Sequence, residues 1–143
     1  MSDVVEWPEG AFGERVARRL REEKVVWLTT VGRDGTPQPN PVWFLWDGAD
    51  SVLVYNRPDA QRLRHLADRP QLALNLDGNG QGGDIVVVTG TAHRDDTAPA
   101  ADVHEEYLAK YRDDMARVSG SVEEFAEQYS VPLRIDVRRI RGF

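Results

Sequence analysis

The sequence contains no cysteine. This absence excludes disulfide bonds, thiolate zinc sites, iron–sulfur clusters and cysteine nucleophiles. Long hydrophobic runs are also missing, because the longest apolar stretch, residues 85–88, is far shorter than the roughly 20 residues that span a bilayer. The first ten residues have neither the basic start nor the apolar centre of a signal peptide. We therefore expect a cytoplasmic protein, in which any redox chemistry belongs to a bound organic group.

Basic residues are fewer than acidic residues in this sequence. Lysine and arginine number 18 against 24 aspartates and glutamates, which gives a formal net charge of −6. Nucleic acids and anionic membranes attract proteins of net positive charge, so neither is an expected partner. The length of 143 residues, with 41% hydrophobic and 29% charged residues, is typical of one globular domain that occupies residues 1–143.

Strand signals dominate the chain. Alternating apolar residues and β-branched runs predict six strands, at residues 25–31, 37–46, 51–56, 71–77, 85–94 and 131–140. Tight turns at residues 32–35 and 47–48 make the first three an antiparallel meander. Pro37, Pro39 and Pro41 remove ladder donors, so the second strand is expected to pair on one side only until about Val42.

Helical periodicity predicts four helices, at residues 9–23, 57–69, 97–118 and 121–129. Asn56 and Pro58 are typical of the start of the second helix, and Ser121 with Glu124 forms a capping box for the fourth. The order lacks the regular alternation of a doubly wound fold. Antiparallel strands with short helices instead favour a closed or nearly closed barrel, because closure removes exposed sheet edges.

Motifs for common chemistries are weak. The glycines of residues 78–83 have the spacing G-x-G-x-x-G but lie between two predicted strands, which favours a mobile hairpin loop. No G-x-S-x-G elbow is present. The three histidines fall in different predicted elements, and a site from Asp102, His104 and Glu106 competes with a solvated acidic helix face. We therefore predict no metal site and name no catalytic residue.

Two local features point to a ligand. The predicted second helix carries a basic cluster, Arg57, Arg62, Arg64, His65 and Arg69, with Gln61 as a further donor. Arginines at a helix N-terminus suit a phosphate group, although a basic face paired with acidic neighbours has the same composition.

The proline-rich segment 38–44 is the second feature. Its prolines leave backbone groups unpaired beside Trp43 and Phe44, which suits a planar heterocycle. An edge strand protected by proline, with its aromatic residues in the core, is the alternative.

Several segments together resemble a known superfamily. They are Val26–Thr30, the turn D-G-T-P-Q at residues 34–38, P-V-W-F at residues 41–44, R-L-R-H-L at residues 62–66 and R-P-Q-L-A-L at residues 69–74. Over roughly residues 9–141 the chain resembles the split-barrel flavin-binding superfamily of pyridoxamine 5'-phosphate oxidase type. Within it, the chain is similar to actinobacterial reductases that depend on the deazaflavin coenzyme F420. The resemblance implies a mainly antiparallel β protein with short helices, a six-stranded split β-barrel of the FMN-binding type.

The resemblance also implies a cofactor site. One strand lines the isoalloxazine-like ring, the end of the third strand lies near the ribityl chain, the basic helix holds the phosphate, and a loop from the partner subunit of a homodimer approaches the cofactor. Arg62 stands where the family usually has lysine, and His65 where it has asparagine. The implied cofactor-binding residues are Gln38, Asn40, Pro41, Val42, Trp43, Tyr55, Asn56, Arg57, Gln61, Arg62, Arg64, Gly83, Asp84 and Ile85.

The function implied is hydride transfer from reduced F420 to a small or medium organic acceptor. Arg57 and Arg64 favour F420 because they could meet its acidic oligoglutamate tail. FMN in a flavin oxidase or reductase is the alternative cofactor. A flavin or F420 carrier or sensor without turnover, a haem-binding protein, and a barrel without a cofactor whose basic helix is only a solvated surface are further alternatives.

Overall fold

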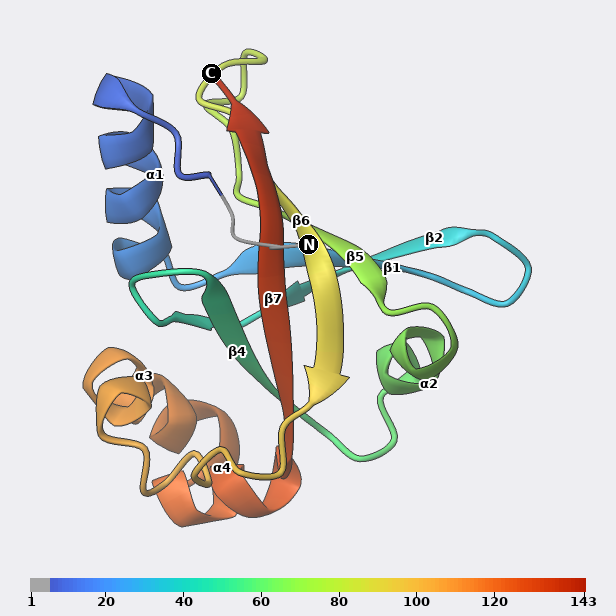
Figure 1. The fold of residues 1–143 in the computed structure, drawn as a ribbon. Helices are drawn as coiled ribbons and strands as arrows, with labels where there is room; N and C mark the ends of the chain where they lie inside the picture. Colours follow the sequence, from blue (N-terminus) through green and yellow to red (C-terminus); the bar gives the residue numbers. More distant parts are fainter. Residues whose placement is uncertain (1–5) are drawn as a thin grey trace.

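The fold, given by a computed structural model, is described for residues 6–143. Its centre is one antiparallel sheet with the order β2-β1-β5-β6-β7-β4-β3 (Figure 1). The strands are β1 (Val26–Val31), β2 (Pro37–Val42), β3 (Leu45–Trp46), β4 (Ser51–Asn56), β5 (Gln71–Asn75), β6 (Val86–Arg94) and β7 (Val131–Gly142). The helices are α1 (Gly10–Glu22), α2 (Gln61–Asp68), α3 (Glu105–Ser119) and α4 (Val122–Gln128).

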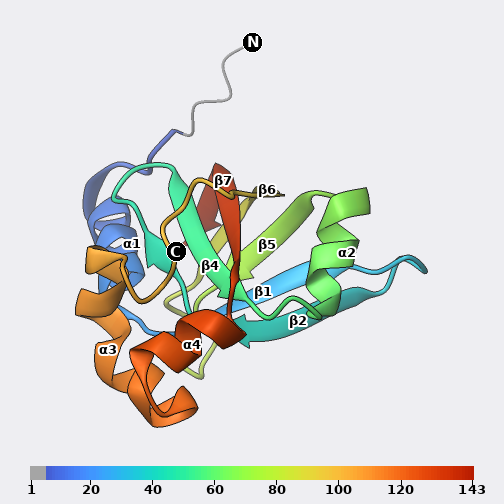
Figure 2. The ribbon, with the colours of Figure 1, turned by 90° about the horizontal axis from the view of Figure 1, so that it is seen from below.

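The sheet contains seven strands in the described chain, so the predicted count of six is wrong. The predicted strand 37–46 is two strands, β2 and β3, which lie at opposite ends of the sheet order. Only Trp43 and Phe44 join them, so the sheet curves back on itself as a half-barrel (Figure 2). The strand breaks there because side chains of α3 take the backbone groups of Phe44 that a ladder would otherwise use.

The proline-rich strand β2 pairs with β1 along its whole length, from Val26↔Val42 to Val31↔Pro37. Its five residues 37–41 are exposed, and Val42 is the first buried position. It is an outer strand of the sheet order, as expected for a strand that lacks several ladder donors.

The hydrophobic core fills the concave side of the sheet. Leu28, Phe44 and Ile135 are completely buried there, and α1 closes one end with Val16 and Leu20. A second cluster, built around Tyr107 and Tyr111, lies under α3 and α4. Along β1, β5 and β6, side chains alternate between the buried concave face and the outer face of the sheet. Trp27 lies on the outer face and is 36% exposed.

Two helix boundaries differ from those predicted. The second helix begins at Gln61 rather than residue 57, because Asn56 ends β4 and its buried amide donates to the carbonyls of Val54 and Val131 instead of capping a helix. Helix α3 begins at Glu105 rather than residue 97, because an Asp95–Thr97 side-chain turn and Pro99 interrupt the preceding segment.

The predicted N-cap of α4 is confirmed, since the Ser121 hydroxyl accepts from the Glu124 amide at 3.0 Å. In residues 6–143, no helix has the length and apolar character that crossing a membrane requires.

Candidate functional site

A cavity of about 210 Å³ opens between the end of β2, the end of β4, α2 and the helices α3 and α4. These elements meet below the open end of the half-barrel, with α2 on one side and α3 with α4 on the other (Figures 1 and 2). The cavity is lined by Pro41, Val42, Trp43, Tyr55, Arg62, Tyr107, Val118, Phe125 and Tyr129. Its wall is therefore mostly aromatic, with one cationic group.

Four rings near this cavity lie in almost parallel planes. Trp43 stacks on Tyr111 at 5.0 Å with an interplanar angle of 6°, and on Phe125 at 5.4 Å with an angle of 12°. Phe125 in turn stacks on Tyr129 at 4.4 Å and 18°. The Arg57 guanidinium lies 5.0 Å from the centre of the Tyr129 ring. We call Tyr111, Trp43, Phe125 and Tyr129 the ring stack.

The bend that presents Trp43 is held by α3. The Tyr111 hydroxyl accepts from the Phe44 amide at 2.9 Å and donates to the Lys24 carbonyl at 2.7 Å. The Lys110 ammonium donates to the Phe44 carbonyl at 2.9 Å and lies 3.9 Å from the centre of the Phe44 ring. Because both backbone groups of Phe44 are held, the position of its neighbour Trp43 is set by the packing of α3.

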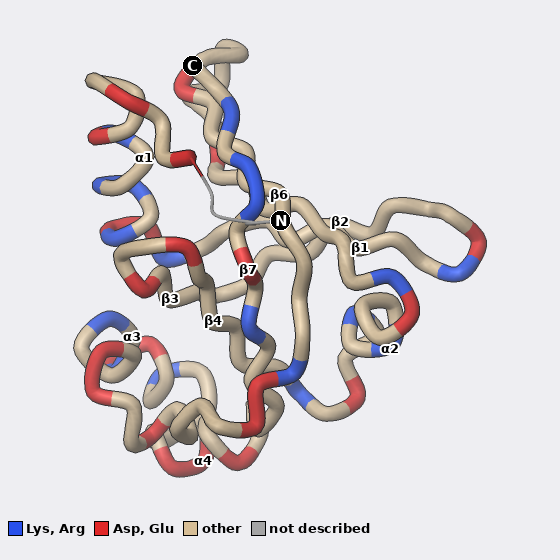
Figure 3. The backbone as a smooth tube through the Cα atoms, in the orientation of Figure 1, with Lys and Arg blue, Asp and Glu red and all other residues tan. Residues whose placement is uncertain are grey.

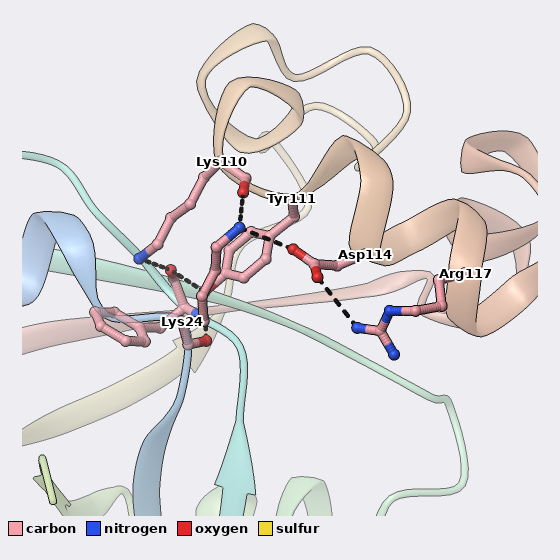
Figure 4. A network of polar contacts seen from close by, with 6 residues as sticks. Lys24, Lys110, Tyr111, Asp114 and Arg117 are labelled. Atoms are coloured by element: carbon pink, nitrogen blue, oxygen red, sulfur yellow. Dashed lines mark hydrogen bonds and ion pairs between the residues drawn. The ribbon is translucent and has the colours of Figure 1, made fainter.

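The same network is charged at its outer side (Figure 4). The Lys24 ammonium pairs with Asp114 at 2.8 Å, and Arg117 donates to the other oxygen of that carboxylate at 3.1 Å. The hydrogen bond from Lys24 is the main cause that lowers the pKa of Asp114. Burial lowers the pKa of Lys110 to about 8, with a further contribution from the nearby charge of Lys24.

Arg62 supplies the cation of the cavity. Its Nε donates to Asn56 Oδ1 at 2.6 Å, and burial lowers its pKa from the ordinary value. Asn56 is fully buried and uses its amide on two carbonyls, so it holds Arg62 in place. Within residues 6–143, no carboxylate forms an ion pair with Arg62, Arg57 or Arg64. Basic positions gather on α2 and the segment before it (Figure 3), which leaves positive charge available to an anion.

The structure brings many predicted site residues together. Pro41, Val42, Trp43, Tyr55 and Arg62 line the cavity itself. Near the cavity, Asn56 accepts a hydrogen bond from Arg62, and the Arg57 guanidinium lies over the Tyr129 ring. The remaining predicted residues of these elements are exposed, Gln61 and Arg64 on α2 and Gln38 and Asn40 on β2.

The predicted loop residues lie elsewhere. Gly83, Asp84 and Ile85 belong to the loop between β5 and β6, beside α1 and at the far end of the sheet from α2 (Figure 1). Asp84 pairs with Arg15 at 3.0 Å, and its carbonyl accepts from Arg19 at 2.8 Å. Ile85 shares an open groove of about 540 Å³ with Trp27 and Pro39 on the outer face of the sheet. Within one chain these three residues do not reach the aromatic cavity.

Sequence reasoning missed the contribution of α3 and α4. Tyr107 and Phe125 were predicted only as helical residues, and Tyr129 as the end of a short helix, yet all three line the cavity. The spacing of Phe125 and Tyr129, four residues apart, shows that they share a helical face, but not that this face meets Trp43.

The histidines serve in local structure. His65 Nδ1 lies 2.9 Å from the Thr30 hydroxyl, and the His104 ring accepts from the Tyr107 amide at the start of α3. His93 lies 3.4 Å from Asp136. Across the part of the chain that the structure describes, no three histidines, aspartates or glutamates are grouped to hold a metal ion.

Comparisons with known proteins agree with this architecture. The family profile described as Pyridoxamine 5'-phosphate oxidase matches residues 12–142. No curated protein matches the sequence significantly. Among solved structures, an F420 reductase is 26% identical, with a TM-score of 0.59 over 92% of this chain and 94% of that chain.

Two further solved structures share the fold. A conserved hypothetical protein from Mycobacterium tuberculosis is 21% identical, with a TM-score of 0.66 over 99% of this chain and 86% of the other. The haem storage protein HutZ from Vibrio cholerae is 14% identical, with a TM-score of 0.61 over 90% and 93%. These similarities extend across the whole half-barrel.

Proposed function

Since this chain belongs to the pyridoxamine 5'-phosphate oxidase family, we propose that it is an oxidoreductase that uses reduced coenzyme F420 to transfer hydride to a small or medium organic acceptor. The observation that carries the proposal is Arg62, a half-buried guanidinium without a carboxylate partner in the described chain, at the edge of an aromatic cavity. The similarity to a solved F420 reductase favours the deazaflavin over other cofactors of this fold.

The chain suits the anionic part of such a cofactor. Arg62, which Asn56 orients through a hydrogen bond, would hold the phosphate, and Arg57, Gln61 and Arg64 would add donors near it. No side chain caps the start of α2 at Ala60, so the first amide groups of this helix also favour an anion. Arginine suits phosphate because its fork of N–H groups can make two charge-assisted hydrogen bonds.

The proline-rich strand β2 suits the planar part. Gln38, Asn40 and Pro41 are exposed, and β2 is an outer strand whose second edge makes no ladder. Val42 and Trp43 continue from this edge into the cavity, and Tyr55 faces them from the end of β4. A planar heterocycle on this edge would meet amide side chains and backbone groups at its rim and apolar groups on its face.

A homodimer would complete the site. Gly83, Asp84 and Ile85 belong to the loop between β5 and β6, which lies at the far end of the sheet from α2, the helix that carries Arg62 (Figure 1). The outer sheet face, which carries Trp27 and Val87, leaves apolar groups on the surface where a second copy could cover them. We propose that the partner covers this face and places its loop near the cofactor.

The coenzyme and the protein chain have different roles in this reaction. The bound reduced coenzyme supplies the hydride, and the acceptor takes a further proton from solvent to complete the two-electron reduction. The chain binds the phosphate, orients the planar ring against β2 and excludes water with its aromatic wall. We assign no catalytic side chain.

FMN is the second candidate, because the same phosphate and ring contacts would hold it. The test is a fluorescence titration of the purified apoprotein with F420, FMN and haem in parallel. We expect micromolar binding of F420 and weaker or no binding of FMN. Tight FMN binding alone would replace the deazaflavin with a flavin, haem binding alone would make the protein a haem binder, and binding of none would overturn the proposal.

A second measurement separates an enzyme from a carrier. Reduced F420 is mixed with the protein and a panel of organic acceptors, and the oxidation of the coenzyme is followed by absorbance. We expect oxidation that depends on both protein and acceptor. Binding of F420 without acceptor-dependent oxidation across the panel would contradict turnover.

A further inference from the structure

Tyr129, the residue that follows α4, lies beside two of the arginines proposed to bind the cofactor. It lines the cavity together with Arg62, and the Arg57 guanidinium lies 5.0 Å from the centre of its ring. Burial lowers the pKa of Arg62, and the Tyr129 hydroxyl close by opposes that shift. One aromatic side chain therefore acts on both cations, although it belongs to neither of the segments that carry them.

The pairing of β4 with β7 brings Tyr129 to this position. The last pair of that ladder is Asn56↔Val131, and the Asn56 side-chain amide also donates to the Val131 carbonyl at 3.0 Å. Arg57 follows Asn56 directly, and Tyr129 precedes Val131 by two residues. The side chains of Arg57 and Tyr129 therefore meet at the end of the ladder, where the two strands separate.

The Tyr129 ring is held in place by α4. The Tyr129 amide donates to the Phe125 carbonyl at 2.8 Å, and its ring stacks on that of Phe125 at 4.4 Å with an interplanar angle of 18°. Phe125 is only 3% exposed, so it is a fixed base for the Tyr129 ring. Since Phe125 covers one face of this ring, the Arg57 guanidinium lies on the other face.

Arg57 has an exposed side chain and forms no ion pair with a carboxylate within residues 6–143. A long exposed side chain has many rotamers, and ordering it when a ligand binds costs affinity. A flat guanidinium on the face of a tyrosine ring is attracted by the ring electrons. The contact with Tyr129 therefore orders the Arg57 charge before a ligand binds, next to the Asn56 that orients Arg62.

We propose that Tyr129 is a positioning residue, which holds the Arg57 guanidinium beside Arg62 so that the two arginines act together on the phosphate and the acidic tail of the cofactor. Arg62 would hold the phosphate, and Arg57 would meet a second negative group beyond it. The role in cofactor binding rests on the proposed function. The pairing of two arginines for a ligand with more than one negative charge does not.

The test is a fluorescence titration of F420 into the wild type, Arg57→Ala, Tyr129→Phe, Tyr129→Met and the double variant Arg57→Ala/Tyr129→Met. Phenylalanine keeps the aromatic face, whereas methionine is a flexible apolar side chain without one. We expect Arg57→Ala and Tyr129→Met each to raise the Kd roughly threefold to tenfold, because a charge-assisted contact is lost or weakened. Tyr129→Phe should bind as the wild type does.

The double variant shows whether Tyr129 acts through Arg57. We expect it to bind F420 as Arg57→Ala does, because two changes that remove one shared contact are not additive. Arg112→Ala is the matched control, since Arg112 is exposed on α3 outside the cavity, and it should not change the Kd. Wild-type affinity in Tyr129→Met, or a further loss in the double variant beyond Arg57→Ala, would overturn the inference.

Salt separates the positioning of a charge from a purely structural role of Tyr129. Salt screens an exposed guanidinium, so F420 binding by the wild type should weaken as the salt concentration rises. This weakening should be smaller in Arg57→Ala and Tyr129→Met, by the same amount, and unchanged in Tyr129→Phe. A loss of affinity in Tyr129→Met that keeps the salt dependence of the wild type would overturn the inference.

Arg57→Lys tests the same contact without any change at the half-buried Tyr129. Lysine keeps the charge but lacks the planar guanidinium that lies flat on a ring. We expect this variant to bind F420 more weakly than the wild type. Should Tyr129→Met fail to fold, wild-type affinity of Arg57→Lys would overturn the inference.

Inorganic pyrophosphate, titrated by calorimetry into the same variants, separates this inference from the proposed function. We expect weaker pyrophosphate binding in Arg57→Ala and Tyr129→Met than in the wild type and Tyr129→Phe. That order in a protein that binds neither F420 nor FMN would support the paired arginines and refute the proposed function alone. F420 binding that is equal in the wild type and Tyr129→Met would overturn this inference alone. Binding of none of the three ligands would overturn both.

Discussion

Single side chains decide the chemistry of this site, and Arg62 decides most. Arg62 stands where the family that the sequence resembles usually has lysine. The structure adds that Asn56 fixes the guanidinium by a 2.6 Å hydrogen bond and that no carboxylate within residues 6–143 neutralises it. A half-buried cation with a neutral hydrogen-bond partner but no carboxylate partner costs desolvation energy, which an anionic ligand would offset.

Replacing Arg62 by alanine should weaken F420 binding. Loss of a charge-assisted hydrogen bond to phosphate costs about 1.5–3 kcal/mol, roughly a ten- to hundredfold rise in Kd. The measurement is the fluorescence titration described above. Arg112→Ala is the matched control, because Arg112 is exposed on α3 and outside the cavity. Equal affinity of the Arg62 variant and the wild type would show that the phosphate binds at another part of the molecule.

Lys110 should give the protein a pH-dependent stability. Its pKa is about 8 in the folded chain, against an ordinary value of 10.5. Between these two pH values the unfolded chain binds more protons than the folded chain, so the contribution of Lys110 to the free energy of unfolding rises with pH. Below pH 8 the lysine is charged in both states, and the burial of its charge destabilises the folded chain by the full amount. In urea denaturation, the stability of the wild type relative to Lys110→Met should therefore increase from pH 7.5 to 9.5. Parallel pH profiles for the two proteins would contradict this.

At the scale of elements, contacts between distant segments set the positions of loops and bends. The glycine-rich loop between β5 and β6 is the clearest case. Buried Arg19 of α1 donates to the carbonyls of Asp77 and Asp84, at the two ends of this loop, and also pairs with Glu23. The loop was predicted to be a mobile hairpin connection, and its two ends are in fact tied to a helix.

Replacing Arg19 by methionine should release the loop. The change leaves two carbonyls without their charged donor, and we expect a loss of about 1.5–3 kcal/mol in the free energy of unfolding. Hydrogen exchange at residues 79–85 should be faster in the variant than in the wild type, and this increase should be larger than any increase in the β6–β7 ladder. Arg18→Met is the control, since Arg18 is an exposed neighbour on the same helix. Unchanged exchange in the loop would show that its own turns hold it.

At the scale of the whole molecule, the half-barrel leaves one sheet face open. Trp27, Pro39 and Val87 line an open groove there, next to the base of the glycine-rich loop. A surface of this kind is costly in water unless it is covered. The proposed homodimer would cover it and bring the loop of one subunit to the cofactor of the other.

A charge on this face should separate the subunits. Val87→Glu places a carboxylate in the groove, where burial against a partner would be unfavourable. Light scattering after size-exclusion chromatography should show a dimer for the wild type and mainly monomer for Val87→Glu, with weaker F420 binding. Val103→Glu, at an exposed position outside the groove, should remain dimeric. A monomeric wild type would contradict the dimer.

The sequence by itself determined what depends on neighbours along the chain. Alternating apolar residues located the strands, Ser121 with Glu124 located the start of α4, and the prolines placed β2 at the edge of the sheet. These follow from backbone geometry and local hydrogen bonds, which a short segment carries by itself. The absence of cysteine likewise needed no structure to exclude thiol chemistry.

Only the tertiary structure decided the break between β2 and β3, the late starts of α2 and α3, and the aromatic cavity. Tyr111 and Phe44 are 67 residues apart, and their hydrogen bonds turn one predicted strand into two. Asn56 fits the pattern of a helix cap but is used in the core, because the carbonyl of Val131 lies beside it. Such contacts depend on which segments the fold brings together, and the local pattern of residues contains no record of them.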